Sequence, residues 1–147
     1  MSNFGPDRYR DLQHFAQVKP AVNQVETHVF QQQKAAREYL KKYGCQIESW
    51  GPFAEGRNDL FTNAVLTEIG ARHGKSAAQV ALRFLLQRDV VVIPKTVRKE
   101  RMVENLSVFD FTLSEDEMAK LAALDTGESL FFSHADPKTV EWFLSIL

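Results

Sequence analysis

Side chains that could bind an anion stand directly after the most apolar run of the chain. Lys95-Thr96-Val97 follows the run Val90–Pro94, and Arg101 comes one turn into the helix expected next. An ammonium, a hydroxyl, backbone N–H groups and a guanidinium fork are the groups that a phosphate prefers. Lys and Arg runs usually form a solvated face, but these residues follow a buried strand, which favours a phosphate site. Glu104 and Asn105 lie one further turn along the same helix.

A second set of polar and aromatic side chains stands near the ends of two other short runs. Ser2 and Asn3 come at the start, Gln24 lies in the run 21–26, and Trp50 ends the run 45–50. The carboxyl ends of strands are where α/β folds place ligand contacts. A hydroxyl and two amides can satisfy a ligand amide, and a flat indole can stack on a ring. Taken singly, the same residues could be a helix cap, a strand-end polar group and a Trp packed under a loop.

Three apolar or β-branched runs must position these groups. Residues 21–26, 45–50 and 90–94 are each followed by a longer segment with the period of an amphipathic helix. This alternation predicts repeated βα units and a parallel sheet. The run 90–94 is apolar throughout, which is typical of a strand covered on both faces. No repeat, low-complexity tract or linker is visible, so residues 1–147 are expected to form one unit.

Caps and glycines indicate where the helices begin and end. The first is expected to follow Gly5-Pro6 and to bury Tyr9, Leu12, Phe15 and Ala16. A second is expected over 30–43, ending at Gly44, and a third, ending at Gly74, would bury Phe61, Val65 and Ile69. Two capping boxes begin later helices, at Ser76 with Gln79 and at Ser114 with Glu117. A last helix from Asp136-Pro137 is expected to pack Val140, Phe143, Leu144 and Leu147.

Composition excludes several classes of partner. The 147 residues are 44% apolar and carry a formal net charge of −1, so neither nucleic acid nor an anionic membrane is expected to bind. The single cysteine, Cys45, is interpreted as a small buried hydrophobe and fits a reducing compartment. No stretch can cross a bilayer and no secretory signal is visible, so a cytoplasmic location is expected. The four histidines lack metal-ligand spacing, so no metal is expected, and His28 is interpreted as structural.

Four segments, in order and spacing, resemble the aldo-keto reductase family. They are Ser2-Asn3-Phe4, Asn23-Gln24-Val25-Glu26, Ser49-Trp50-Gly51-Pro52-Phe53, and Ile93 to Arg98 followed by Arg101, Glu104 and Asn105. The tail from Phe109 to Asp125 also matches, so the resemblance covers nearly the whole chain. It is strongest to the bacterial group resembling diketogluconate reductases, which also has Trp at the position of Trp50.

This resemblance implies an α/β fold, the C-terminal half of a (β/α)8 TIM barrel. The half would run from the end of the fifth strand through the eighth strand and the C-terminal helices. A full barrel typically takes roughly 250 residues, so the chain would be short by about four strands. The segments 1–4, 21–26, 45–50 and 90–94 would then be the ends or bodies of the fifth to eighth strands.

The resemblance also implies NADPH as the cofactor and gives roles to the residues named above. Ser2, Asn3 and Gln24 would bind the nicotinamide carboxamide, and Trp50 would stack on the nicotinamide ring. The loop that begins at Gly51 and Phe53 would close over the pyrophosphate. The remaining candidates would bind the adenosine end, with the 2′-phosphate held by Lys95, Thr96, Val97 and Arg101 and the adenine edge by Glu104 and Asn105.

The family's catalytic residues are absent from this sequence. Members reduce aldehyde and ketone groups with an Asp, Tyr, Lys and His set from the first four strands, and Tyr9, Tyr39 and Tyr43 here lie in helix patterns. No catalytic residue is therefore expected. One interpretation is an NADPH-binding half that a missing N-terminal half completes into a reductase of small carbonyl substrates. The others are a non-catalytic half-barrel that pairs with a second copy or binds NADPH weakly, and an unrelated phosphate-binding barrel.

Overall fold

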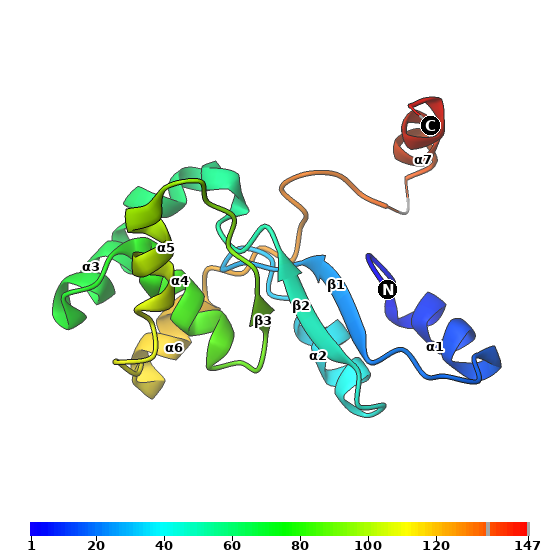
Figure 1. Ribbon diagram of the computed structural model, residues 1–147, viewed down its shortest axis with the longest axis horizontal. Coiled ribbons are helices and arrows are strands. Elements are labelled where there is room, and N and C mark those ends of the chain that lie inside the picture. The colour runs from blue at the N-terminus through cyan, green and yellow to red at the C-terminus, as the bar shows by residue number, and fades with distance from the viewer. Residues whose placement is uncertain (135, 147) are drawn as a thin grey trace.

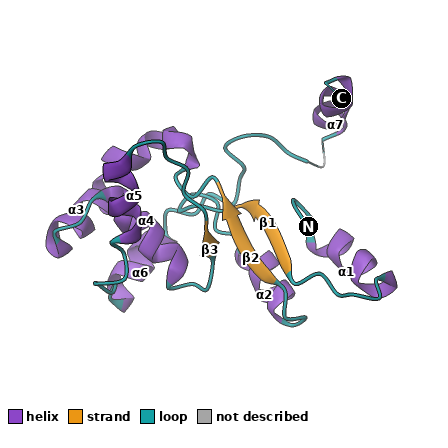
Figure 2. Cartoon of the chain, in the orientation of Figure 1, coloured by secondary structure: helices purple, strands orange, loops and turns teal. Residues whose placement is uncertain are grey.

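A three-stranded parallel sheet lies at the centre of the molecule (Figures 1 and 2). The computed structural model describes residues 1–134 and 136–146. Its strands β1 (Val22–Glu26), β2 (Gln46–Trp50) and β3 (Val91–Val92) lie side by side in that order. On the other side of β1, a parallel bridge pairs Ser2 with Gln24. The predicted βα repeats and parallel sheet are confirmed, and the carboxyl ends of all three strands meet at one edge.

Seven α-helices and one 3-10 segment connect and cover the described strands. The 3-10 segment is Ala54–Thr62, and the helices are α1 (Pro6–Phe15), α2 (Lys34–Lys41), α3 (Ala64–His73), α4 (Ala77–Leu86), α5 (Lys99–Leu106), α6 (Glu115–Ala122) and α7 (Pro137–Ser145). Both predicted capping boxes are formed, at the start of α4 and at the start of α6. The predicted stop at Gly74 holds, since Gly74 is the left-handed C-cap of α3, whereas α2 ends at Lys41, two residues before its predicted end at 43.

Two helices differ from their predicted extents because other contacts hold the chain. The helix expected over 30–43 begins only at Lys34. The Gln32 side-chain amide donates to the carbonyl oxygens of Val29 (2.7 Å) and Leu121 (2.9 Å), and its backbone N–H donates to Asp125 (3.0 Å). These bonds tie residues 29–32 to the end of α6. Phe61, expected on a helix face, lies in the 3-10 segment and is exposed, because Asn63 caps α3 just after it.

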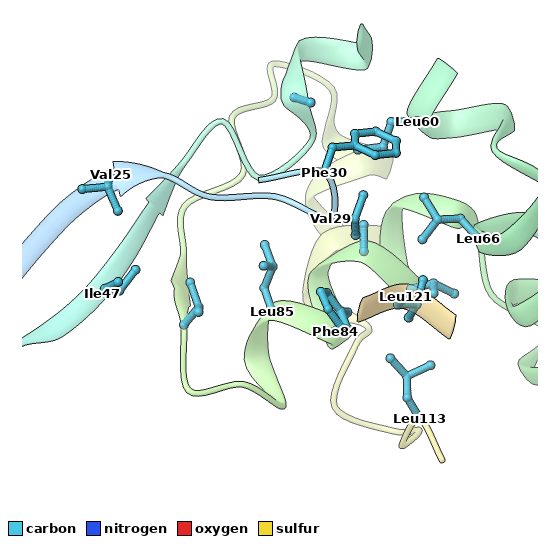
Figure 3. Close-up of a cluster of buried hydrophobic side chains, with 14 of the residues drawn as sticks. Val25, Val29, Phe30, Ile47, Leu60, Leu66, Phe84, Leu85, Leu113 and Leu121 are labelled. Atoms are coloured by element: carbon cyan, nitrogen blue, oxygen red, sulfur yellow. The ribbon is translucent and has the colours of Figure 1, made fainter. Parts of the chain in front are cut away.

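The hydrophobic core lies between the outer face of the sheet and the helices α3, α4 and α6 (Figure 3). Val25 and Ile47 point from the strands toward Phe84 and Leu85 of α4, and Leu121 of α6 completes the cluster. Burial of this apolar surface, at roughly 25 cal/mol per Å², fixes the outer face of each strand. Period-2 alternation then sends every other strand residue to the inner face.

The inner face of the sheet is only partly covered. Gln24, Glu48 and Val91 lie in register across it, and Val91 is 42% exposed. Ile93, just beyond β3, is 50% exposed. The expectation that the run 90–94 is covered on both faces is therefore wrong. The physical reason is that β3 is the last strand of the sheet, and no described strand pairs with its free edge.

The terminal helices bury less than their patterns predict. In α1 only Tyr9 is buried, while Leu12 and Phe15 are exposed, because α1 packs on α2 through one side. Helix α7 stands apart from the sheet (Figure 1), and Val140 and Leu144 are exposed, so its predicted packing is wrong for these residues. Phe143 contacts the Phe132 ring, with centroids 5.3 Å apart. Leu147 lies outside the described residues.

A buried carboxylate ties the tail to β1. Glu26 receives hydrogen bonds from the Ser129 hydroxyl (2.5 Å) and the Leu130 backbone N–H (2.9 Å), and its Oε1 lies 2.9 Å from His28 Nε2. Burial alone would raise the pKa of Glu26, but the bonds from His28, Ser129 and Leu130 outweigh it and lower that pKa below its ordinary value. The ionised form is thus the one that holds residues 129–130 in place.

Replacing this carboxylate should destabilise the chain in a pH-dependent way. Because the folded pKa of Glu26 lies below the unfolded one, its contribution is present above the ordinary value of 4.5 and is lost as the pH falls through the folded pKa. Glu26→Gln should lower the free energy of unfolding at neutral pH by about 1.5–3 kcal/mol. Urea unfolding of both proteins at neutral and acidic pH measures it. Glu141→Gln, an exposed carboxylate in α7, is the control. An equal loss at both pH values would contradict this assignment.

Candidate functional site

Parallel pairing brings the predicted strand-end residues together. The Ser2 hydroxyl donates to the Gln24 carbonyl oxygen (3.2 Å), and the Asn3 backbone N–H donates to the same oxygen (2.8 Å). The Trp50 indole N–H donates to Asn3 Oδ1 (2.7 Å). Four side chains from three separated segments therefore lie in one cluster at the carboxyl edge of the sheet. Together they offer a hydroxyl, two amides and a flat ring, as the sequence predicts.

Trp50 has aromatic neighbours from the tail. The Phe132 ring stacks on the indole, with centroids 6.4 Å apart and planes at 21°, and the Phe131 ring meets it edge-on at 5.2 Å. The Arg57 guanidinium lies 4.2 Å from the centre of the Phe131 ring. In sequence, Phe131-Phe132 is only an aromatic pair in a tail. Its place depends on the Glu26 bonds to residues 129–130, and no motif revealed these bonds.

A cavity of about 680 Å³ collects most of the other candidates. It begins at Gly51 and Phe53, directly after Trp50, so it continues the strand-end cluster. Its walls include five further predicted residues, which are Lys95, Thr96, Arg101, Glu104 and Asn105. Val97 is different, because its side chain is 82% exposed and it does not line the cavity. Of Val97, only the backbone N–H could take part in the predicted phosphate binding.

The start of α4 forms a wall of this cavity that the sequence did not reveal. Ser76, Ala77 and Ala78 line it, together with Glu55 and Phe61 of the 3-10 segment. The Ser76 hydroxyl donates to Glu104 Oε1 (2.5 Å), and the Gln79 side-chain amide donates to the Glu104 carbonyl oxygen (3.1 Å). The capping box therefore also fixes α5 against α4. The sequence showed the cap, but it could not show which helix the cap would contact.

The cations of the cavity remain available for an anion. Among the ion pairs of residues 1–134 and 136–146, none includes Lys95 or Arg101. Arg98, by contrast, pairs with Glu100 at 2.5 Å and is exposed. A phosphate in the cavity would meet two positive groups that form no direct ion pair among the described residues.

Histidine, tyrosine and cysteine side chains have structural roles. His28 is fully buried, and its Nδ1 accepts from the backbone N–H groups of Phe30 (3.2 Å) and Gln31 (3.1 Å), which confirms the structural interpretation. Tyr9 and Tyr39 both contact Tyr43 in a cluster between α1 and α2, away from the strand ends. Cys45 is buried, and burial raises the pKa of its thiol.

The described residues form neither a metal-binding cluster nor a membrane-spanning helix. Within the described part of the chain, no group of three or more His, Cys, Asp or Glu residues could hold a metal ion. None of the described helices has the length and apolar character needed to span a bilayer.

Comparison with known proteins agrees with this arrangement. The model of the aldo/keto reductase family matches residues 1–126. Glyoxal reductase of Bacillus subtilis (strain 168) is 45% identical over 128 residues, which are 87% of this chain and 46% of that protein. A crystal structure of a protein described as a 2,5-diketo-D-gluconic acid reductase B superimposes with a TM-score of 0.85 at 36% identity, over 91% of this chain and 47% of that one.

A third relative was solved with a cofactor. The aldo-keto reductase of the silkworm, Bombyx mori, complexed with NADPH, has a TM-score of 0.80 and 34% identity, over 92% of this chain and 43% of that one. The chain thus spans about half the length of these relatives. Its three parallel strands are part of their TIM-barrel fold. With a family model that matches residues 1–126, the chain belongs to the aldo/keto reductase family.

Proposed function

We propose that this chain is the C-terminal, NADPH-binding half of a carbonyl reductase. The observation that carries the proposal is the single cavity that joins Gly51, Phe53, Lys95 and Arg101 and continues the cluster around Trp50. In the proposal, Lys95, Thr96 and Arg101 bind the 2′-phosphate, while Glu104 and Asn105 face the adenine. The nicotinamide end lies at the carboxyl edge of the sheet.

The donor chemistry of these residues fits NADPH. A cavity of about 680 Å³ with two unpaired cations suits a phosphorylated adenosine, and the adjacent amides and indole suit a planar carboxamide ring. When bound, NADPH supplies the hydride that reduces an aldehyde or ketone to an alcohol. The residues of this chain bind and orient it. They do not supply a proton, because the three tyrosines of the sequence lie on or next to α1 and α2.

The proposal therefore requires a second polypeptide segment that carries the proton donor. The uncovered inner face of the sheet, with Val91 and Ile93 exposed, is the surface where four further βα units would close a barrel. Such a segment would resemble the half of the relatives that this chain does not match. It would also complete the pocket for a small carbonyl substrate, next to Phe131 and Phe132.

Cofactor preference tests the 2′-phosphate site. Arg101→Ala should weaken NADPH binding about tenfold or more, because a charge-assisted hydrogen bond contributes on the order of 1.5–3 kcal/mol. Binding of NADH, which lacks the phosphate, should not change. Calorimetric titration of both cofactors measures this, with Arg98→Ala as the control because Arg98 pairs with Glu100. An equal loss for NADPH and NADH would show that Arg101 does not read the phosphate.

An activity assay tests whether the second half of the barrel must supply the proton donor. The chain alone should not consume NADPH in the presence of aldehydes or a diketo sugar acid, because its three tyrosines, all described, lie away from the strand ends. Mixing it with the unmatched half of a related reductase should restore turnover. Turnover by the chain alone, above a control without enzyme, would overturn this proposal.

A second candidate is a non-catalytic half-barrel that pairs with a copy of itself. A larger cavity of about 840 Å³ lies beside β3, and residues of α2, the start of β2 and α5 also line it. Apolar side chains line it, among them Val91, Met102, Leu106 and Phe109, all exposed. Unpaired strand edges of this kind recruit another strand. A second copy is one source of such a strand, and the complementary half is the other.

Solution mass tests whether the purified chain pairs with itself. Light scattering should give a mass above that of one chain, since closing the free edge removes exposed apolar surface from water. Leu106→Glu should return the chain to a monomer, whereas Leu144→Glu, at a similarly exposed position in α7, should not. A single-chain mass combined with cooperative melting would show that the open edge does not drive association.

A further inference from the structure

Glu48 is the immediate neighbour of Gln24 on the inner face of the sheet. The two residues are register partners in the parallel pair of β1 and β2. The Gln24 side-chain nitrogen Nε2 donates to Glu48 Oε1 at 2.6 Å, and both side chains are half-buried. Glu48 is not one of the residues that line the 680 Å³ cavity. The one hydrogen bond described for its side chain is the bond from Gln24, so any effect of Glu48 on a ligand would pass through Gln24.

The chemistry of Glu48 fixes how the Gln24 amide is turned. An ionised carboxylate can only accept hydrogen bonds, so it can face the NH₂ of an amide but not its carbonyl oxygen. Gln24 must then direct its Oε1 away from Glu48. Trp50 acts in the opposite sense on Asn3, because an indole N–H can only donate and so holds Asn3 Oδ1 at 2.7 Å.

Each amide is thereby left with one defined group for a ligand. No hydrogen bond among the described residues uses Gln24 Oε1 or Asn3 Nδ2. Gln24 thus presents an acceptor, and Asn3 presents a donor. A primary carboxamide has one NH₂ and one carbonyl oxygen, so it matches this pair in a single orientation.

We infer that Glu48 is a positioning residue that sets the direction in which the nicotinamide carboxamide binds. The inference rests on the proposed function and adds a residue that does not itself touch the cofactor. The carboxamide NH₂ would then donate to Gln24 Oε1, and its carbonyl oxygen would accept from Asn3 Nδ2. Turning the carboxamide by 180° would place donor against donor and acceptor against acceptor, so one bound orientation is selected.

A graded series of substitutions tests the direction of the bond. Glu48→Gln keeps a carbonyl acceptor, Glu48→Ala removes any partner, and Glu48→Lys offers only donors, which would turn the Gln24 amide around. NADPH affinity of the full chain should fall in that order, with a loss of about tenfold for Glu48→Ala. Affinity for 2′-phospho-ADP-ribose, which lacks the nicotinamide, should stay the same in every variant and shows that the fold and the cavity are intact. Glu141→Gln is the charge-matched control.

An analogue separates positioning from a merely structural role. In 3-acetylpyridine adenine dinucleotide phosphate a methyl group replaces the carboxamide NH₂, so Gln24 Oε1 has no donor to accept from. Titrated as its reduced form, this analogue should bind the wild-type chain and Glu48→Ala equally. Equal losses for NADPH and the analogue, or unchanged NADPH affinity in all three variants, would overturn the inference alone. If the wild-type chain binds neither NADPH nor 2′-phospho-ADP-ribose, the proposed function fails and the inference falls with it.

Discussion

Parallel pairing of β1 with β2 and of β2 with β3 is the constraint from which the site follows. In a parallel sheet every strand ends at the same edge, so residues far apart in sequence become neighbours without any direct attraction between them. Gln24 is the middle residue of β1, Trp50 ends β2, and Lys95 follows the end of β3. Helices α2 and α4 pack their apolar sides on the outer face of the sheet, α3 packs on α4, and the inner face is left for polar groups.

The orientation of the side-chain amides on the inner face is set by neighbours that can only donate or only accept hydrogen bonds. Glu48 can only accept and the Trp50 indole can only donate, so the amides between them have no freedom to turn. Glu26, the last residue of β1, also acts only as an acceptor, and its ionised oxygens hold the tail through Ser129 and Leu130. Buried or half-buried carboxylates of this kind are costly unless they are fully hydrogen-bonded. Both oxygens of Glu26 have partners within the chain, and Oε1 of Glu48 accepts from Gln24.

The sequence was most informative where a local rule decides the structure. Capping boxes at Ser76 and Ser114, the stop at Gly74 and the strand–helix alternation depend on a few neighbouring residues, and all were predicted correctly. Lys95 and Arg101 are close in sequence and belong to one family motif, so the sequence alone identifies them as residues of one site. Predictions failed where burial depends on distant partners. Leu12, Phe15, Val91 and Leu144 have core-like patterns but remain exposed, because no described element covers them. Glu48 could not be identified, since its importance depends on strand register.

Chemical-shift mapping by NMR tests most directly whether NADPH binds along the strand ends. Titrating NADPH into the isotope-labelled chain should move the Trp50 indole N–H and the Gln24 and Asn3 side-chain amides. It should also move the backbone amides from Lys95 to Asn105, while those of α1 and α7 should stay in place. Shifts confined to the cavity of about 840 Å³ beside β3, or no shifts at saturating NADPH, would contradict the assignment of this chain as an NADPH-binding half of a reductase.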